Sequence, residues 1–476
     1  MRFNIRHILP LALMTFGCGA ETSFSEEPVV EAAEIGVHQQ SMLQVTACTD
    51  CLSSTTGARL LTGFDRERIE GDVYHYSLRL QVGPDAAHDV VVLHRVVREW
   101  LPWFPVPTSD AAFLVHGDAW DFRGAFMAST LTRDPGVAKD HSVAVYLAQK
   151  GVDVWGIDLR WTQVPETTQD FTFMKNWNLG THAQDVGAGL SVARTMRLLT
   201  GSSGAPMHLL GWSRGAQMAY AYMNTEARLP KSQRNVSGFI PVDMALKFGP
   251  EANQQREWAC ARAQLGEQLL AQGRYEGNLS GAGAGVTILS VGQAAIAMPD
   301  VIAPAPLPAL PFRDLGRAVG AATFSFLTDP SNNVNPSVPF YHFTAGTFDA
   351  GGSLTKLRHV NDRQFFDFLS SAHPYQSFTE MVEGDQLMCG KKNLPYDDYL
   401  KDVKVPVLYV GAEGGFGSYG VYSAKSVLGS QDVTVLLVKE NAATGRLAEY
   451  GHADLWLAGD AEKKVWEPIY NWMKRH

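Results

Sequence analysis

The sequence has no block of basic residues. Its 476 residues include 40 Lys and Arg against 49 Asp and Glu, a formal net charge of -9 at pH 7. Because a protein that binds nucleic acid needs a basic patch to neutralise phosphates, this balance excludes nucleic acid as an expected partner. After Met14 there is also no uninterrupted apolar run of the roughly 20 residues that a transmembrane helix needs, so no membrane span is expected.

The N-terminal residues resemble an export signal. Two arginines precede the short apolar run Ile8–Met14, which is typical of a secretory signal peptide. The run ends at Thr15–Cys18, which resembles a bacterial lipobox, and this resemblance implies a lipid anchor on Cys18. The small residues there also fit ordinary cleavage, so we expect an exported protein, either lipid-anchored at the bacterial cell envelope or secreted. Residues 1–18 are the predicted signal and 19–55 a flexible tether, poor in large apolar groups.

Cysteine is scarce, with five residues in the chain. A zinc site at Cys48 and Cys51 would need a second pair of ligands at suitable spacing, and none follows closely, so no metal is expected. If Cys18 is lipidated, the other four cysteines form an even set, and an exported context favours disulfides. Three pairings are possible. We favour Cys48 with Cys51 and Cys260 with Cys389, because the second pair would join the two ends of an insertion described below.

The stretch Met207–Tyr222 carries the most informative pattern. An apolar run of strand length meets Gly-x-Ser-x-Gly at Gly211–Gly215, and a segment with helical spacing of apolar residues follows. This context is typical of a nucleophile elbow, in which a serine sits on a strained turn with its hydroxyl exposed. Ser213 is therefore the predicted nucleophile. The backbone N–H of Arg214 is the first predicted oxyanion donor.

Strands alternate with helices around this stretch, and the alternation implies a parallel sheet with right-handed crossovers, after an antiparallel hairpin at its start. Asp140 is the predicted N-cap of a helix that ends at Gly151, and a second helix is predicted from about His182 to Leu199. The predicted strands are Tyr74–Val82, Val90–Leu93, Ala111–Val115, Val152–Asp158, Met207–Leu210, Gly238–Asp243, Val405–Gly411 and Val433–Val438.

The alternation breaks between residues 247 and 399. We predict a helical cap there, inserted into a core formed by residues 56–246 and 400–476. Its small and apolar residues fit either a mobile lid over an apolar cleft or a helical lobe that packs for stability. The predicted helical pieces are Gln254–Gln272, Val286–Met298, Arg313–Phe326 and Arg363–Met388.

Two further groups complete a hydrolytic site. Gly117 directly follows a buried strand and lets the backbone bend towards Ser213, so the N–H of Asp118 is the second predicted oxyanion donor. The carboxylate of Asp118 must point away, because its charge would oppose an oxyanion; otherwise the donor is a neighbouring residue. Among fourteen histidines, His452 is the predicted base, since it lies in a loop after the final strand and follows Gly451.

These segments resemble the α/β-hydrolase family over roughly Val73–Met473. Within the family, Phe113–Gly117, Gly151–Trp155 and Gly451–Trp456 are similar to motifs of the acid-lipase branch. The resemblance implies an α/β-hydrolase fold, with a mostly parallel eight-stranded sheet and an inserted cap. It also implies hydrolysis of a carboxylic ester through an acyl-enzyme, without metal or organic cofactor.

The acid of the predicted triad has two candidates. In the acid-lipase pattern an aspartate follows the strand that ends here at Gly411, and Glu413 is the only carboxylate in that loop. Asp243, just after the strand that follows the elbow, is the rival, because some α/β-hydrolases carry their acid there. We favour Glu413, whose longer side chain and neighbouring glycines would compensate for its early position.

The leading functional hypothesis is a serine esterase or lipase that acts on apolar acyl esters, as small molecules or lipids. An amidase or peptidase with the same triad is the second hypothesis, because ester and amide hydrolysis share one type of intermediate. The third is a non-catalytic lipid-binding lipoprotein, which only the displaced acid favours.

Overall fold

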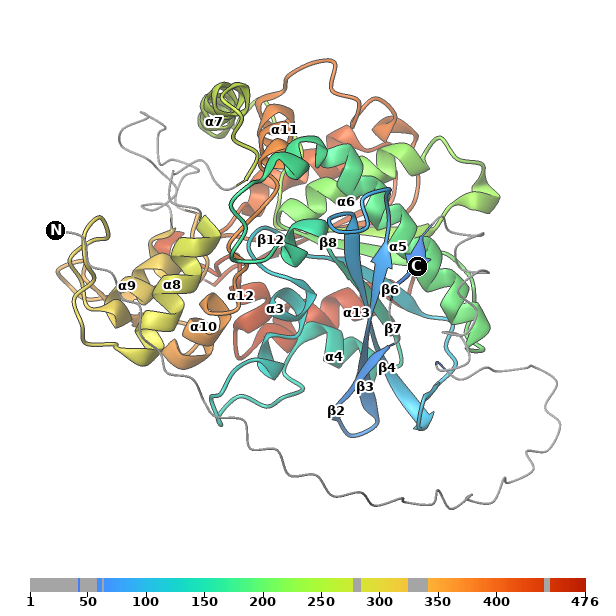
Figure 1. The fold of residues 1–476 in the computed structure, drawn as a ribbon, viewed down its shortest axis with the longest axis horizontal. Helices are drawn as coiled ribbons and strands as arrows, with labels where there is room; N and C mark the ends of the chain where they lie inside the picture. The colour runs from blue at the N-terminus through green and yellow to red at the C-terminus, as the bar shows by residue number, and fades with distance from the viewer. Residues whose placement is uncertain (1–41, 43–57, 62–63, 277–283, 324–340, 441–445) are drawn as a thin grey trace, which may run out of the picture. The chain divides into compact units, whose positions relative to one another are not determined.

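The computed structural model describes residues 42, 58–61, 64–276, 284–323, 341–440 and 446–476 (Figure 1). The predicted signal, the lipid anchor at Cys18, the Cys48–Cys51 pair and all of the predicted tether except Met42 lie outside these residues. Residues Gln39–His476 form one unit, so the predicted cap is not a separate body. Among the helices of the described ranges, none is both long enough and apolar enough to cross a membrane.

The described residues form an eleven-stranded sheet in the order β1-β3-β4-β7-β6-β8-β9-β12-β13, with β2 beside β3 and β5 beside β4. From β7 to β13 neighbouring strands are parallel, whereas β3, β4 and β7 are antiparallel. The eight predicted strands are all present and the predicted fold class is confirmed, but the sheet has three more strands, β1, β2 and β5, than the predicted eight. The strands are β1 (Arg59–Leu60), β2 (Asp65–Glu70), β3 (Val73–Gln81), β4 (Val90–Leu101), β5 (Phe104–Pro105), β6 (Ala111–Val115), β7 (Asp153–Asp158), β8 (Met207–Trp212), β9 (Val236–Val242), β12 (Val407–Ala412) and β13 (Val433–Val438).

Helices cover both faces of the central strands, which are buried at every residue of β6 and β8. Because side chains alternate between faces, Leu114 and Leu210 pack in one core with residues of α4 and α13, while Phe113 and Leu209 pack in another with residues of α5 and α6. The helices that surround the sheet are α3 (Phe122–Phe126), α4 (Val143–Gln149), α5 (Leu179–Leu199), α6 (Arg214–Glu226), α12 (Asp454–Leu457) and α13 (Glu467–Met473).

The N-terminal ends of α4 and α5 differ from the predicted ones for local reasons. The N-cap of α4 is Ser142 and not Asp140, whose carboxylate accepts a hydrogen bond from the Gln149 side chain instead. Helix α5 begins before His182, because the Asn178 side chain caps its first turn. At the C-terminus a π-helical turn precedes α13, which has Pro468 in its first turn; proline lacks the N–H that a continuous α-helix would need.

The predicted cap contains five helices among its described residues, and they form two groups: α7 packs against α11, and α8, α9 and α10 pack together (Figure 1). The single helix predicted over Arg363–Met388 is wrong, because the chain leaves α10 before Pro374 and re-enters a helix only in α11. The small hairpin of β10 and β11 was not predicted. These elements are α7 (Asn253–Ala271), α8 (Ala284–Ala297), α9 (Phe312–Ala321), β10 (Gly346–Phe348), β11 (Leu354–Leu357), α10 (Asp362–Leu369) and α11 (Phe378–Cys389).

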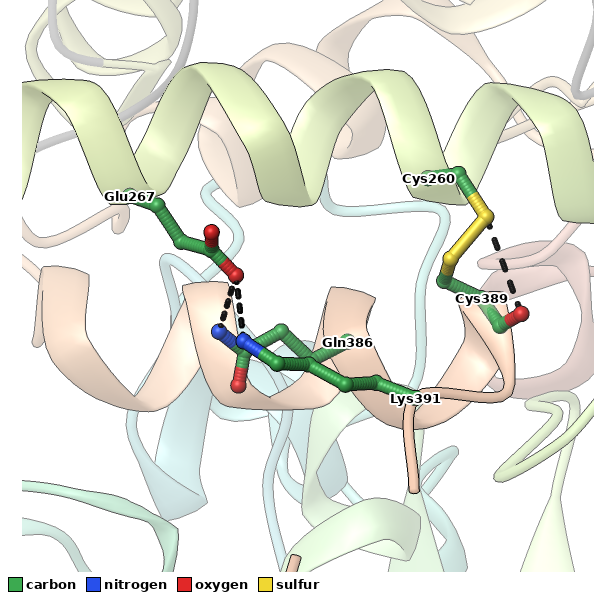
Figure 2. Close-up of a disulfide and its surroundings, with 5 residues drawn as sticks. All are labelled: Cys260, Glu267, Gln386, Cys389 and Lys391. Atoms are coloured by element: carbon green, nitrogen blue, oxygen red, sulfur yellow. Dashed lines mark hydrogen bonds and ion pairs between the residues drawn. A yellow bond between two sulfur atoms is a disulfide. The ribbon is translucent and has the colours of Figure 1, made fainter. Parts of the chain in front are cut away.

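A disulfide joins the first and last helices of this region (Figure 2). Cys260 of α7 and Cys389 of α11 are bonded, with their Cα atoms 4.6 Å apart, which confirms the predicted pairing. On the same interface Glu267 Oε1 accepts hydrogen bonds from Lys391 Nζ at 2.6 Å and Gln386 Nε2 at 2.7 Å. Helices α7 and α11 are thus held together by one covalent bond and a polar cluster.

Candidate active site

Ser213 lies on the turn between β8 and α6 with φ 57° and ψ −133°, a conformation that L-residues adopt only under strain. The flanking glycines make this turn possible. A Cβ on Gly211 would come within 2.5 Å of the Gly215 oxygen, and a Cβ on Gly215 would come within 2.3 Å of the Val115 and His116 oxygens. Both glycines of the Gly-x-Ser-x-Gly pattern are therefore needed, because β8, α6 and the end of β6 approach one another closely here.

Backbone strain concentrates around this turn. Five non-glycine residues of the described chain have positive φ, and three of them are Ser213, Ala119 and Asp243. Ala119 lies in the loop after β6 and Asp243 directly follows β9. Strained residues persist where the surrounding structure holds them, and such places are often functional sites.

The loop after β6, residues 117–121, is called the oxyanion loop below. A Cβ on Gly117 would lie 2.6 Å from Ser213 Cβ, so only glycine permits this approach. The buried His116 ring fixes the start of the loop: its Nε2 accepts from the Leu159 N–H at 3.1 Å and its Nδ1 donates to the Gly117 oxygen at 2.9 Å. Among the described residues, neither the Asp118 nor the Arg214 N–H has a protein acceptor, which is the state that an oxyanion donor needs.

His452 lies in the loop after β13 and is packed against the elbow. The Trp212 ring stacks on its imidazole with 4.8 Å between ring centroids. Its Nδ1 is hydrogen-bonded to Asp243 Oδ2 at 2.6 Å, and both side chains are almost fully buried. The structure therefore brings Ser213, His452 and Asp243 to one place, at the carboxyl ends of the strands.

The carboxylate that contacts His452 is Asp243, so the preference for Glu413 is corrected. The loop after β12 has another task, which is to surround Asp243. Asp243 Oδ1 accepts from the N–H groups of Ala412 and Gly417, each at 2.9 Å, and Oδ2 accepts from that of Phe416 at 3.3 Å. The glycines that seemed to give Glu413 its reach instead let this loop close on the carboxylate.

Gly415 shows how tight that closure is. A Cβ built there would lie 1.9 Å from Asp243 Oδ2, the oxygen bound to His452. Any side chain at this position would displace the carboxylate or the loop. The sequence contains a signal for this arrangement. Gly414, Gly415 and Gly417 cluster just after β12, where the chain must approach the Asp243 carboxylate at the end of β9.

The inserted region contributes directly to the His452 loop. The His452 N–H donates to the His342 oxygen at 3.0 Å, and the Ala453 N–H donates to the Phe343 oxygen at 2.7 Å. The ring of Tyr341 lies 5.1 Å from the imidazole, centroid to centroid. Residues 341–343 thus form one wall of the site, and the insertion is part of its framework.

The side chain of Arg214 is buried beside the elbow and bonded on several sides. Its Nε donates to Asp118 Oδ2 at 3.2 Å, and its Nη1 donates to Gln217 Oε1 at 3.1 Å and the Met381 oxygen at 3.2 Å. Its Nη2 lies 3.5 Å from Asp385 Oδ1. Burial alone would lower the pKa of Arg214, but the carboxylates of Asp118 and Asp385 raise it, so the guanidinium stays charged. The Asp118 carboxylate is therefore paired, as its place next to a predicted oxyanion donor demands.

Asp454 fixes the His452 loop from within. Its Oδ2 accepts from the Gly451 N–H at 2.7 Å and from the Ala345 N–H at 2.8 Å. Burial raises the pKa of Asp454 to about 7, although the two N–H groups oppose the shift. The folded chain therefore binds this proton more tightly than the unfolded chain, whose aspartates titrate near pH 3.9. Stability from this group is complete below about pH 4 and is lost as the pH rises to about 7.

We expect Asp454→Asn to remove this pH dependence. The asparagine oxygen can still accept both N–H groups but cannot ionise. Between about pH 5 and about pH 8 the wild type should lose about 2 to 3 kcal/mol of unfolding free energy relative to the variant. Urea denaturation of both proteins at the two pH values measures the difference. An equal difference in unfolding free energy between the two proteins at both pH values would contradict the raised pKa of Asp454.

Comparisons with known proteins bear on the fold. No protein-family model matches the chain, and no curated protein matches it. A solved structure of a putative lipase from Sulfolobus solfataricus is similar, with a TM-score of 0.56 and 19% identity over 87% of this chain and 99% of that one. An epoxide hydrolase mutant from Vigna radiata has TM-score 0.41 and 9% identity over 88% and 99%; an Exiguobacterium antarcticum esterase has 0.39 and 13% over 81% and 96%. The last two structures are too weakly similar to support any conclusion about this chain. The chain has the α/β-hydrolase fold.

Three groups at the site escaped the sequence reasoning: the Arg214 side chain, Asp385 and Asp454. Arg214 follows the nucleophile directly and Asp118 lies in the oxyanion loop, so both are expected near Ser213. Their ion pair could therefore have been predicted from the sequence. Asp385 gives no such signal, because it lies far along the chain on α11. In the described ranges no three His, Cys, Asp or Glu side chains are arranged to hold a metal ion.

Proposed function

We propose that this protein is a serine carboxylic-ester hydrolase of the esterase or lipase type. The observation that supports it most is the buried His452–Asp243 hydrogen bond of 2.6 Å beside the strained Ser213 elbow. A histidine whose Nδ1–H is held by a carboxylate presents its Nε2 as a base, and this is what a serine hydroxyl needs in order to attack a carbonyl.

In the proposed reaction Ser213 Oγ bonds to the ester carbonyl carbon while His452 takes its proton. The oxyanion is held by the N–H groups of Asp118 and Arg214. The tetrahedral intermediate collapses, His452 gives the proton to the departing alcohol, and an acyl-enzyme remains. Water, activated by His452, then releases the acid and restores Ser213. Asp243 keeps the imidazole in the required tautomer throughout, and no metal or organic cofactor enters these steps.

Residues 247–399 act as a cap on a core of residues 56–246 and 400–476, with aromatic side chains towards the site that favour apolar acyl groups. The protein is exported. Either a lipid on Cys18 anchors it to the cell envelope, or ordinary cleavage of the signal releases it. The lipobox-like sequence supports the anchor.

Active-site labelling tests the mechanism. Purified protein is treated with a fluorescent fluorophosphonate, and the labelled peptide is identified by mass spectrometry. We expect the label on Ser213, and turnover of p-nitrophenyl esters with little turnover of the matched p-nitroanilides, since an amide has the poorer leaving group. Comparable anilide turnover would favour an amidase or peptidase. A folded protein with neither label nor turnover would favour the lipid-binding lipoprotein.

A further inference from the structure

The oxyanion loop is held by the inserted region on both of its sides. On one side α10 and the connection that follows it meet the loop: Trp120 Nε1 donates to the Phe368 oxygen of α10 at 2.9 Å, and the His373 N–H of the connection donates to the Ala119 oxygen at 2.6 Å. The Trp120 ring also stacks on Phe368 with 4.2 Å between centroids. On the other side the only ion pair of the Asp118 side chain among the described residues is with Arg214.

Helix α11 supplies the far end of that second connection. Arg214 bonds to the Met381 oxygen and pairs with Asp385, and Asp385 Oδ2 accepts from Arg262 Nε of α7 at 3.1 Å. Gly384 lets α11 come this close, since a Cβ there would lie 2.4 Å from Arg214 Nη1. A continuous chain of contacts therefore runs from α7 through α11 and Arg214 to the oxyanion loop.

The three side chains of this chain of contacts differ in how far they are buried. The side chain of Asp385 is fully buried and that of Arg214 is 5% exposed, whereas that of Asp118 is 32% exposed. The guanidinium is thus fixed at its Asp385 end, and the partly exposed Asp118 side chain is held by it. Without a fixed guanidinium the Asp118 carboxylate would be free to rotate towards the developing oxyanion, where its charge would oppose catalysis.

The disulfide joins the same two helices, α7 and α11, that carry Arg262 and Asp385. Cys389 follows Asp385 by one helical turn, and Cys260 precedes Arg262 by two residues, so the disulfide joins α7 and α11 within about one turn of the Arg262–Asp385 pair. The buried ion pairs of Asp385 with Arg214 and Arg262 contribute little net stability compared with apolar side chains of the same volume. Its place beside the nucleophile points to a role in geometry.

We propose that Asp385 is a positioning residue of the active site, which acts through the Arg214 side chain to hold Asp118 and the second oxyanion donor in place. This inference rests on the proposed function. Asp385 itself does not touch the substrate. It makes the cap a support of the oxyanion hole, in addition to any part the cap has in covering the site.

The test compares Asp385→Asn with the wild type in kcat, KM and inhibition by an aryl trifluoromethyl ketone. The ketone forms a hemiketal oxyanion on the serine and so reports on the oxyanion hole. We expect kcat to fall about 10- to 100-fold, less than or near the loss of a whole donor, and the inhibition constant to rise by the same factor. KM should stay within about threefold, because the ground-state ester does not depend on the oxyanion donors.

Glu267→Gln is the matched control. It removes an ion pair from the same α7–α11 interface, at a point that does not reach Arg214. We expect it to change thermal stability slightly and to leave kcat and the inhibition constant unchanged. If Asp385→Asn yields no folded protein, Arg214→Lys replaces it: lysine keeps the buried cation but lacks the planar fork that reaches Asp118 and Asp385 together. The same paired changes are expected from it.

Two results would overturn the inference: a variant with wild-type kcat, or a fall in kcat with no change in ketone inhibition, since that would be a general structural effect. Wild-type turnover in the same assays separates the two proposals. An inactive wild type would overturn the proposed function and this inference with it. An active wild type with an unchanged Asp385→Asn variant would overturn this inference alone.

Discussion

Replacing Asp243 by asparagine should lower kcat for ester hydrolysis by about ten-thousandfold, whereas Glu413→Gln should leave it within about twofold of the wild type. The asparagine keeps the volume of the side chain and an oxygen for the Ala412 and Gly417 N–H groups, so the loop after β12 stays in place. What changes is the group facing His452 Nδ1. An amide there can offer an N–H, which holds the imidazole in the tautomer whose Nε2 already carries a proton and cannot act as a base.

Steady-state kinetics of the two variants on one p-nitrophenyl ester measure this difference, with fluorophosphonate labelling as a second readout. Glu413→Gln serves as the control because it neutralises a carboxylate on the same loop that does not bond to His452. Strong loss in Glu413→Gln together with retained activity in Asp243→Asn would restore the acid that the sequence pattern favoured and would contradict the geometry described above.

The two candidates illustrate what local sequence can and cannot provide. Both carboxylates stand at strand ends, and a single sequence does not say which of them a distant histidine meets. The deciding facts are three-dimensional: β9 and β12 are neighbours, Asp243 takes a positive φ, and Gly415 leaves room for its carboxylate. The glycine-rich loop after β12 suggests room for the long side chain of Glu413, but in the structure this loop closely encloses the shorter side chain of Asp243.

The elbow, in contrast, was predictable because all of its causes lie within a few residues. The strand, the two glycines, the serine and the helix follow one another, and the steric reason for each glycine is a contact within the same turn or with the adjacent strand. The six parallel strands were equally accessible, since such strands are continuous apolar runs bounded by turns, and the Gly83–Asp85 turn marks the antiparallel pair β3 and β4.

The insertion was the part least open to prediction. Helical spacing located α7 and α8 to within a few residues, but Arg363–Met388 was interpreted as one helix although Pro374 interrupts it. The pairing of α7 with α11 followed from counting cysteines, not from periodicity. That α11 also reaches Arg214 depends on Gly384 and on the path of the whole insertion, for which no local pattern exists.

Replacing Ser213 by alanine should lower kcat by about four orders of magnitude or more and abolish fluorophosphonate labelling, because no other group can form the acyl-enzyme. The fold should persist, since alanine and serine meet the same strain at φ 57°. Catalytic groups that act as a unit also have non-additive effects. The double variant Ser213→Ala with Asp243→Asn should therefore be no slower than Ser213→Ala alone, because a correctly oriented His452 has no hydroxyl to activate.

Residual turnover of the single and double variants, each purified on unused resin to exclude wild-type enzyme, measures this non-additivity. Pretreatment with fluorophosphonate should leave both residual rates unchanged, whereas any wild-type contaminant would be silenced by it. A further large loss in the double variant would mean that Asp243 and His452 promote hydrolysis without Ser213, for instance by activating water directly. The proposed acyl-enzyme would then be wrong, although the His452–Asp243 pair would remain the centre of the site.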